Sequence, residues 1–155
     1  MSHANETLLR DFYRAFGQKD WKAMEPAYHP EVHFTDPVFD LHGPRVIGMW
    51  RMLCTSSTDL TLVNPFAEAD DRTGRARWEA TYTFSLTGRK VLNVIDASFE
   101  FRDGKIVRHI DDFNFWKWSS QALGPSGMLL GWTPLVRAKV QRTANARLEK
   151  FLAKL

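Results

Sequence analysis

The chain of 155 residues is 44% hydrophobic and 25% charged, which predicts one folded globular domain and excludes a disordered or fibrous protein. The net charge is +3, but residues 133–155 hold six Lys or Arg and one acid, so residues 1–132 carry a net charge of −2. A body without excess positive charge argues against binding of nucleic acid.

Apolar residues in the first half of the chain have mainly helical spacing. Asn5 is predicted to cap a first helix that ends at Gly17. Asp20 is predicted to cap a second helix, which should be short or kinked because Pro26 lies too late for its first turn. The other elements expected here are a strand over residues 32–35 and a helix that starts at Gly43-Pro44.

The period changes to that of strands in the second half. Strands are predicted over residues 59–69, 75–86, 91–101 and 105–115, with turn signals at Thr87-Gly88 and at residues 102–104. One face of the second of these strands would carry Ala76, Trp78, Ala80, Tyr82, Phe84 and Leu86. An antiparallel meander with the helices on one face is an α+β fold.

The last part of the chain is expected to be a link followed by a basic helix. Residues 119–132 read as irregular, and Thr133-Pro134 would start a helix that runs to about Lys154. Its apolar stripe would consist of Val136, Val140, Ala144, Leu148, Phe151 and Leu155. We favour packing of this stripe on the body or on a second subunit, and a contact of the basic helix with an anionic membrane or a partner is the alternative.

Several acids occur inside apolar strands, where acids are disfavoured. Alternation places Asp96 on one face with Leu92 and Val94, and it places His109, Asp111, Phe113 and Phe115 on one face. A solvated face is the simpler explanation for any single one of these acids. Together with Asp36 in FTDPVF and the many aromatic residues, they favour a polar site in an apolar pocket.

The order of these motifs over about residues 5–118 resembles the nuclear-transport-factor-2-like superfamily, which includes ketosteroid isomerases, SnoaL-like polyketide cyclases and limonene-epoxide hydrolases. The resemblance implies a cone-shaped, curved antiparallel sheet with helices on its concave side around a deep pocket. It implies a SnoaL-like domain over residues 1–118, followed by a linker and an amphipathic helix over residues 119–155.

Ketosteroid isomerases resemble this chain in two segments. FTDPVF is similar to the segment that carries their general base, which implies that role for Asp36. VIDASFEFRDGKI is similar to the strand with their second, protonated acid, which implies that Asp96 donates to the oxyanion. Phe12 aligns with their catalytic tyrosine, Tyr13 is turned away by about 100°, and Tyr82 is the candidate for a replacement phenol.

The cyclases and epoxide hydrolases resemble the segment GKIVRHIDDF. Asp111 falls on a functional acid of both, and His109 with Asp111 could form an acid/base pair. The hydrolases also need an Arg-x-Asp pair, and the aligned positions here are Trp78 and Ala80. Epoxide hydrolysis is therefore disfavoured.

The resemblance implies an isomerase or cyclase that uses acid–base catalysis on a small hydrophobic molecule and needs no cofactor. The alternative is a non-catalytic module that binds a hydrophobic ligand or serves assembly. Predicted catalytic residues are Asp36, Asp96, Asp111, His109 and Tyr82, and predicted ligand-binding residues are Phe12, Phe16, Trp50, Trp78, Phe84, Val94 and Phe113.

Metal, partner and compartment are also predicted. His29, His33 and Asp36 form H-x-x-x-H-x-x-D, but this segment spans a turn and a strand, which does not converge the ligands, so no metal site is expected. His42 is expected to be a turn residue. With no signal core, no long apolar run and a lone Cys54, the protein is expected to be cytoplasmic. The resemblance implies a homodimer.

Overall fold

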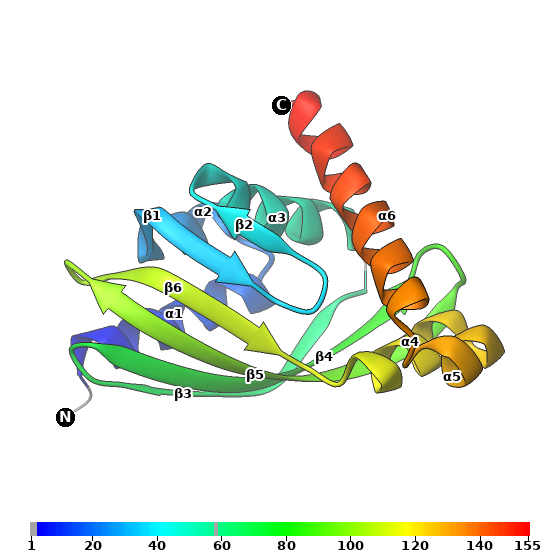
Figure 1. The fold of residues 1–155 in the computed structure, drawn as a ribbon. Coiled ribbons are helices and arrows are strands. Elements are labelled where there is room, and N and C mark those ends of the chain that lie inside the picture. The colour runs from blue at the N-terminus through cyan, green and yellow to red at the C-terminus, as the bar shows by residue number, and fades with distance from the viewer. Residues whose placement is uncertain (1–2, 58) are drawn as a thin grey trace.

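One six-stranded, strongly curved sheet carries helices on its concave side, as expected for the α+β class (Figure 1). The computed structural model describes residues 3–57 and 59–155. The strand order is β2-β1-β6-β5-β4-β3. The strands are β1 (Tyr28–Thr35), β2 (Asp40–His42), β3 (Thr61–Ala69), β4 (Thr73–Phe84), β5 (Arg89–Arg102) and β6 (Lys105–Asp112).

Helices precede the first strand, interrupt the sheet once and follow its last strand. They are α1 (Ala4–Gly17), α2 (Trp21–Met24), the 3-10 helix η1 (Glu25–Ala27), α3 (Pro44–Ser56), α4 (Phe115–Leu123), α5 (Pro125–Leu130) and α6 (Pro134–Ala153). Among the described residues, no helix has both the length and the apolar content that crossing a lipid bilayer requires.

The sheet is antiparallel except between β1 and β6, which run parallel. In this pair Phe34 lies opposite His109. The pairing brings the chain's first strand next to its last one, so the sheet curls around the helices. Alternation along β4 and β5 turns Trp78, Ala80 and Ile95 inward, where they join the core.

Two local predictions differ from the structure, and a third is confirmed. His3, not Asn5, caps α1, because the His3 ring accepts the Asn5 backbone N–H while the Asn5 side chain reaches the Asp70 carbonyl. The segment 40–42 forms an edge strand, so His42 is not a turn residue. The second helix is predicted to be short or kinked because of Pro26, and this is confirmed: α2 has four residues and gives way to the 3-10 helix η1, which contains Pro26.

The predicted irregular link over residues 119–132 is wrong, because most of it forms α4 and α5. Gly127 and Gly131 let the two helices approach closely. A Cβ on Gly127 would lie 1.9 Å from the Ser119 carbonyl oxygen, and one on Gly131 would lie 2.0 Å from the Ser119 hydroxyl. The G-x-x-x-G spacing is thus a packing feature of this helix pair.

Helix α6 lies across the open end of the curved sheet, from α3 to α4 and α5 (Figure 1). Leu148 is fully buried in the main core, and Val136 and Val140 pack on a second, smaller cluster with Trp118. Packing of the stripe on the body is therefore confirmed for these positions, whereas Leu155 is exposed.

Candidate functional site

A chain of four hydrogen-bonded side chains crosses the interior. Trp50 Nε1 donates to the Tyr28 hydroxyl at 2.8 Å, and that hydroxyl lies 2.8 Å from His109 Nδ1. His109 Nε2 lies 2.8 Å from Asp111 Oδ1. These residues come from α3, β1 and β6, and all four are buried.

The Trp50 donor at one end favours one direction for the hydrogen bonds between these four side chains. Because Trp50 can only donate, the Tyr28 oxygen accepts its N–H, and the arrangement that leaves no buried proton unpaired has Tyr28 donate to His109 Nδ1. His109 then carries its hydrogen on Nε2 and donates it to Asp111. The His109 ring thereby holds one oxygen of the Asp111 carboxyl group and orients the other.

Aromatic rings enclose this chain. His109 stacks on Trp50 and meets Phe34 edge-on at a centroid distance of 4.9 Å, and Phe12 packs against both Trp50 and Tyr28. Apolar walls with few polar atoms strengthen every charge and hydrogen bond inside them. Burial raises the pKa of Tyr13, Tyr28 and Asp36, and the charge of Asp111 adds to the effect on all three.

Two buried side-chain donors, Tyr13 and Trp78, are poorly satisfied, and Tyr13 lies within the influence of the Asp111 charge. The Tyr13 hydroxyl and Trp78 Nε1 are near each other, with ring centroids 5.8 Å apart, and the Trp78 N–H partly stabilises the Tyr13 oxygen, yet neither group has a hydrogen bond of full geometry among the described residues. Burial, followed by the charge of Asp111, raises the pKa of Tyr13 well above its usual value, so the phenol stays protonated. Buried unpaired donors are costly and call for a ligand or water.

Asp36 sits at the tip of the β1–β2 hairpin. Its Oδ1 accepts the backbone N–H groups of Val38 and Phe39 at 2.7 and 2.6 Å, so the residue is a turn former as well as a candidate acid. Burial raises the pKa of Asp36 to about 7 despite these two hydrogen bonds, with a further contribution from Asp111. A carboxylic acid with this pKa exchanges protons near neutral pH.

Tyr82 lies on the inner face of β4, as predicted. Its oxygen accepts the Trp118 Nε1–H at 2.6 Å, which leaves the Tyr82 proton free to be donated elsewhere. Burial raises the pKa of Tyr82, and the charge of Asp36 adds to the effect, so these two groups share one environment. Tyr82 is therefore a second neutral phenol near Asp36.

The structure does not bring Asp96 to the site, and its predicted role as oxyanion donor is wrong. Asp96 lies on the outer, solvent face of β5, where its side chain is 63% exposed and pairs with Arg77 at 3.3 Å. Alternation had placed it correctly beside Val94, but the shared face points outward, so Val94 does not line the interior either. The inner face of β5 carries Asn93, Ile95 and Ala97 instead.

The other predicted lining residues point inward. Phe12, Phe16, Trp50 and Trp78 are buried and fill the interior, while Phe84 and Phe113 are part-buried beside the smaller cluster. Two hollows of about 340 and 400 Å³ are found among the described residues, and neither is lined by Asp36 or Asp111. The larger one reaches Tyr82 and Val91.

Sequence reasoning missed Tyr13, Tyr28 and the unpaired Trp78 donor as polar groups of the site. The inference that Tyr13 points away is wrong, because α1 is buried over a wide face that holds both Phe12 and Tyr13. Tyr28 follows Pro26 and gave no strand signal of its own. The alternation Tyr28, Val32, Phe34 was visible only from residue 32 onward.

Comparisons with known proteins fit this geometry. A family model described as a SnoaL-like domain matches residues 9–109. No curated protein matches the chain.

Solved structures share the fold. A candidate polyketide cyclase from Xanthomonas campestris pv. campestris is 21% identical, with 76% of this chain and 96% of that chain covered at a TM-score of 0.65. A candidate isomerase from Bacillus subtilis is 22% identical over 76% and 91%, with a TM-score of 0.62. An LEH-like epoxide hydrolase from M. tuberculosis is 16% identical over 86% and 95%, with a TM-score of 0.60.

Proposed function

The chain belongs to the SnoaL-like domain family, and from this premise we propose that it is an enzyme that moves a proton on a small hydrophobic molecule with Asp36 and Asp111. The observation that carries the proposal is the buried Tyr13 hydroxyl, which lies within the influence of the Asp111 charge and, with only the Trp78 indole beside it, has no acceptor for its own proton among the described residues. A hydrogen-bond donor without an acceptor can bind a substrate oxygen, and a nearby carboxylate fixed by a histidine can accept a substrate proton.

Each group has a role in such a reaction. Asp36, with a pKa of about 7, takes a proton from carbon in its ionised form and returns it in its neutral form. Tyr13 and Trp78 donate hydrogen bonds to the substrate oxygen as negative charge develops there. Asp111, fixed by His109, orients the substrate or carries the second proton.

The test measures proton exchange rather than one product, because the substrate is not identified. The wild type is incubated in D₂O with a panel of small cyclic ketones and enones, and deuterium at the carbon next to the carbonyl is followed by mass spectrometry. Asp36→Asn and Asp111→Asn should each slow the exchange at least about 100-fold, the usual scale of general acid–base catalysis.

Asp96→Asn is the matched control, because it makes the same chemical change on the outer face. Its exchange rate should equal that of the wild type. Unchanged exchange in Asp36→Asn, or equal losses in all three variants, would refute the proposed roles.

A second candidate function is a non-catalytic module that binds a hydrophobic ligand. It is favoured by the interior itself, which aromatic side chains fill, and by the absence of Asp36 and Asp111 from the two hollows of the described residues. On this alternative, quenching of tryptophan fluorescence by the ketone panel should be equal in the wild type and in Asp36→Asn, and no deuterium should enter the ligands.

A further inference from the structure

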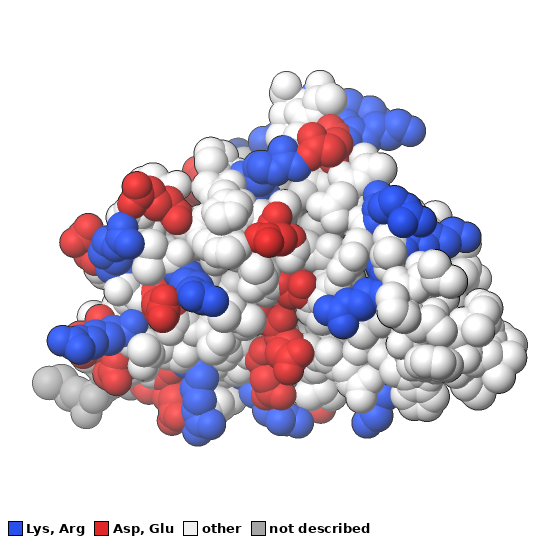
Figure 2. All heavy atoms as spheres, in the orientation of Figure 1, with Lys and Arg blue, Asp and Glu red and all other residues white. Residues whose placement is uncertain are grey.

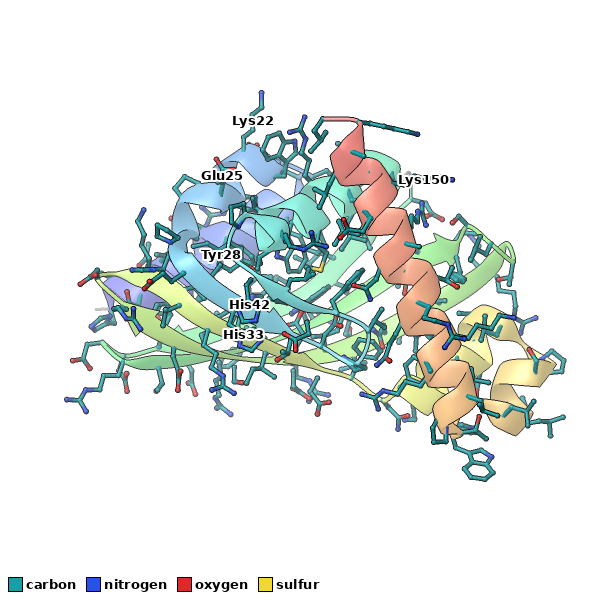
Figure 3. All side chains as sticks on the ribbon, turned by 45° about the horizontal axis from the view of Figure 1, so that its top comes forward. Lys22, Glu25, Tyr28, His33, His42 and Lys150 are labelled. Carbon is teal, nitrogen blue, oxygen red and sulfur yellow. The ribbon has the colours of Figure 1, made fainter. Side chains whose placement is uncertain are left out.

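The β1–β2 hairpin brings together two histidines and an aspartate that are not part of the interior site. His33 lies directly opposite His42 in the register of the two strands, and Asp40 is two residues before His42 on β2. Figure 3 shows His33 and His42 side by side. Since alternate residues of a strand share a face, all three side chains project from the outer face, opposite the buried Phe34 and Leu41.

The donor atoms of these side chains are close enough to share one ion. His33 Nε2 is 2.6 Å and His42 Nε2 is 3.8 Å from Asp40 Oδ1, and all three ligand atoms lie within 4.8 Å of one another. The two imidazoles stack at a centroid distance of 4.1 Å. Ligands around a tetrahedral zinc ion are roughly 3.3 Å apart, given zinc–ligand distances of about 2.0–2.1 Å.

We propose that His33, Asp40 and His42 form a binding site for a divalent first-row transition metal, with Zn²⁺ as the fitting ion. Two imidazole nitrogens and one carboxylate oxygen are borderline ligands that suit Zn²⁺ better than Ca²⁺ or Mg²⁺. Asp40 and His42 are largely exposed, so their side chains can turn until the three lone pairs converge. Three protein ligands leave the fourth position to water, as in open zinc sites.

A bound ion would tie the two strands of this hairpin together. β2 has three residues and forms the edge of the sheet, and the turn between the strands carries Asp36. The ion would therefore hold a short edge strand and the turn that positions the proposed base. The site itself needs only the hairpin geometry, so it stands independently of the proposed enzyme function.

The test uses Zn²⁺ alone, in a chelator-free buffer, by titration calorimetry and thermal unfolding. The wild type should bind one Zn²⁺ per chain, and the melting temperature should rise with the Zn²⁺ concentration, because the ion binds only the folded hairpin. His42→Asn and Asp40→Asn should each weaken binding at least tenfold. Mg²⁺ should give no shift.

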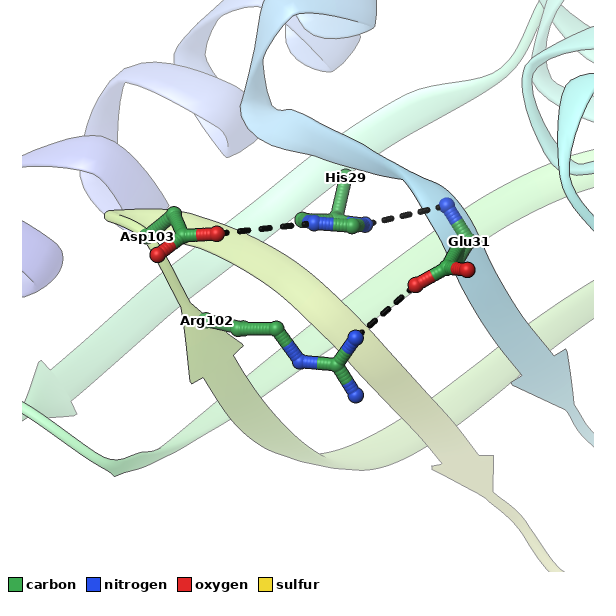
Figure 4. A network of polar contacts seen from close by, with 4 residues as sticks. All are labelled: His29, Glu31, Arg102 and Asp103. Atoms are coloured by element: carbon green, nitrogen blue, oxygen red, sulfur yellow. Dashed lines mark hydrogen bonds and ion pairs between the residues drawn. The ribbon is translucent and has the colours of Figure 1, made fainter.

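His29→Asn is the control, because His29 lies on the same strand but belongs to a different network. In Figure 4 its Nδ1 accepts the Glu31 backbone N–H at 3.0 Å, and its Nε2 is 3.9 Å from Asp103, next to the Arg102–Glu31 pair. This variant should bind Zn²⁺ like the wild type. No binding by the wild type, one ion per two chains, or equal weakening in His29→Asn and His42→Asn would overturn the site.

A second surface, carried by other observations, lies at the α5 end of the molecule. Six large apolar side chains are exposed there, between 43% and 81%, and we call them the α5 patch: Trp116, Met128, Leu129, Leu130, Trp132 and Leu135. They adjoin one another, since the Trp116 indole donates to the Met128 carbonyl and the Trp132 indole donates to the Leu129 carbonyl. Exposed clusters of this kind mark interaction surfaces.

Charge around the patch has one sign. Residues 113–148 contain five Lys or Arg and no Asp or Glu. Figure 2 shows the white end formed by α4 and α5 with blue side chains beside it, while red and blue mix over the rest of this face. In a symmetric dimer through the patch, Lys117, Arg137 and Lys139 would gather with their own copies, which opposes self-association.

We infer that the α5 patch docks on an anionic lipid surface. Exposed Trp and Leu side chains insert at the level of the headgroups, and flanking Lys and Arg are attracted by the negative surface potential. The inferred contact lies on α5 and the turn into α6, because most of the apolar stripe of α6 is packed on the body.

The docking test compares sedimentation with vesicles of phosphatidylcholine alone and with vesicles that also contain phosphatidylglycerol. The wild type should bind only the anionic vesicles, and Leu129→Ser/Trp132→Ser should lower the bound fraction at least tenfold. Phe66→Ser/Leu155→Ser, which changes two exposed apolar side chains on β3 and just after the end of α6, should bind like the wild type. The inference would be overturned if the wild type did not bind the anionic vesicles, or if Leu129→Ser/Trp132→Ser bound them as well as the wild type does. It would also be overturned if the wild type were a dimer in solution and Leu129→Ser/Trp132→Ser were a monomer.

Discussion

At the scale of single residues, the polar groups of the interior depend on one another. Tyr28 is the link between a donor that has no other acceptor, Trp50, and an imidazole that needs a donor, His109. Removal of its hydroxyl therefore leaves a buried group unpaired on each side.

Tyr28→Phe should lower the free energy of unfolding by about 2–4 kcal/mol, the cost of two buried polar groups without partners. Urea denaturation followed by circular dichroism measures this loss. Tyr82→Phe removes one acceptor from the part-buried Trp118 contact and should cost less than half as much. Equal losses of unfolding free energy in the two variants would show that the hydrogen bonds of Tyr28 to Trp50 and His109 add no more stability than the single Tyr82–Trp118 contact.

Asp36 gives the stability of the protein a pH dependence of defined sign. Its pKa is raised from 3.8 to about 7 in the fold, so the native state keeps a proton that the unfolded chain releases between these values. Stability should fall as the pH rises from about 4 to 7, by at most about 4 kcal/mol, and then level off.

Asp36→Asn keeps an oxygen for the turn but cannot ionise. Its melting temperature should therefore exceed that of the wild type increasingly from pH 4 to pH 7, and the two should converge at pH 4. Parallel curves at all pH values would mean that the Asp36 carboxyl titrates normally.

The residues also show where sequence reasoning stops. Alternation assigned His109 and Asp111 to one face correctly, and it also grouped Asp96 with Val94 correctly. Alternation alone cannot say which face of β5 points inward, because Leu92 and Val94 made the outer face look apolar. Side-chain partners such as Tyr28 and His109 are 81 positions apart and become visible only in three dimensions.

At the scale of elements, strongly periodic segments were predictable and short ones were not. The meander β3–β6, α1 and α6 follow from long runs with one period. β2 has three residues and α5 has six, too few for a period to appear, and both depend on tertiary contacts. In particular, α5 depends on its packing against α4. Gly127 and Gly131 have no side chain there, which leaves room for the close contact with Ser119.

Gly127→Ala should separate α5 from α4, since its Cβ would meet backbone rather than a movable side chain. Overpacking of this kind costs about 1–3 kcal/mol. Hydrogen exchange by mass spectrometry should show faster exchange in peptides from residues 115–131. Ser126→Ala, on the exposed side of the same helix, should leave the exchange unchanged, and slow exchange in both variants would contradict the packing role.

At the scale of the whole molecule, α6 joins parts that the sheet alone leaves apart. Gln141 and Asn145 donate to the carbonyl groups of Pro37 and Val38 at 2.9 and 3.2 Å, directly beside Asp36. The helix thus keeps water from the turn that carries the acid, and burial is the largest cause of the raised Asp36 pKa.

Gln141→Ala/Asn145→Ala should loosen α6 and admit water to Asp36. The pKa of Asp36 should then fall from about 7 toward 3.8, as measured by carbon NMR of the labelled carboxyl group. Thr143→Ala, an exposed position on the same helix, serves as the control. A pKa that stays near 7 in the double variant would show that α6 does not control access.

The parallel contact between β1 and β6 has a consequence for how the protein is made. It joins Phe34 to His109 across most of the domain, and the Tyr28–His109 hydrogen bond depends on it. A nascent chain on the ribosome holds α1, β1 and their aromatic side chains long before β6 has been translated. Pairing between such distant segments is slow to form. We therefore expect the candidate site to form late in folding. Until then, the aromatic side chains of α1 and β1 stay exposed on the unfinished chain, where chaperones can bind them.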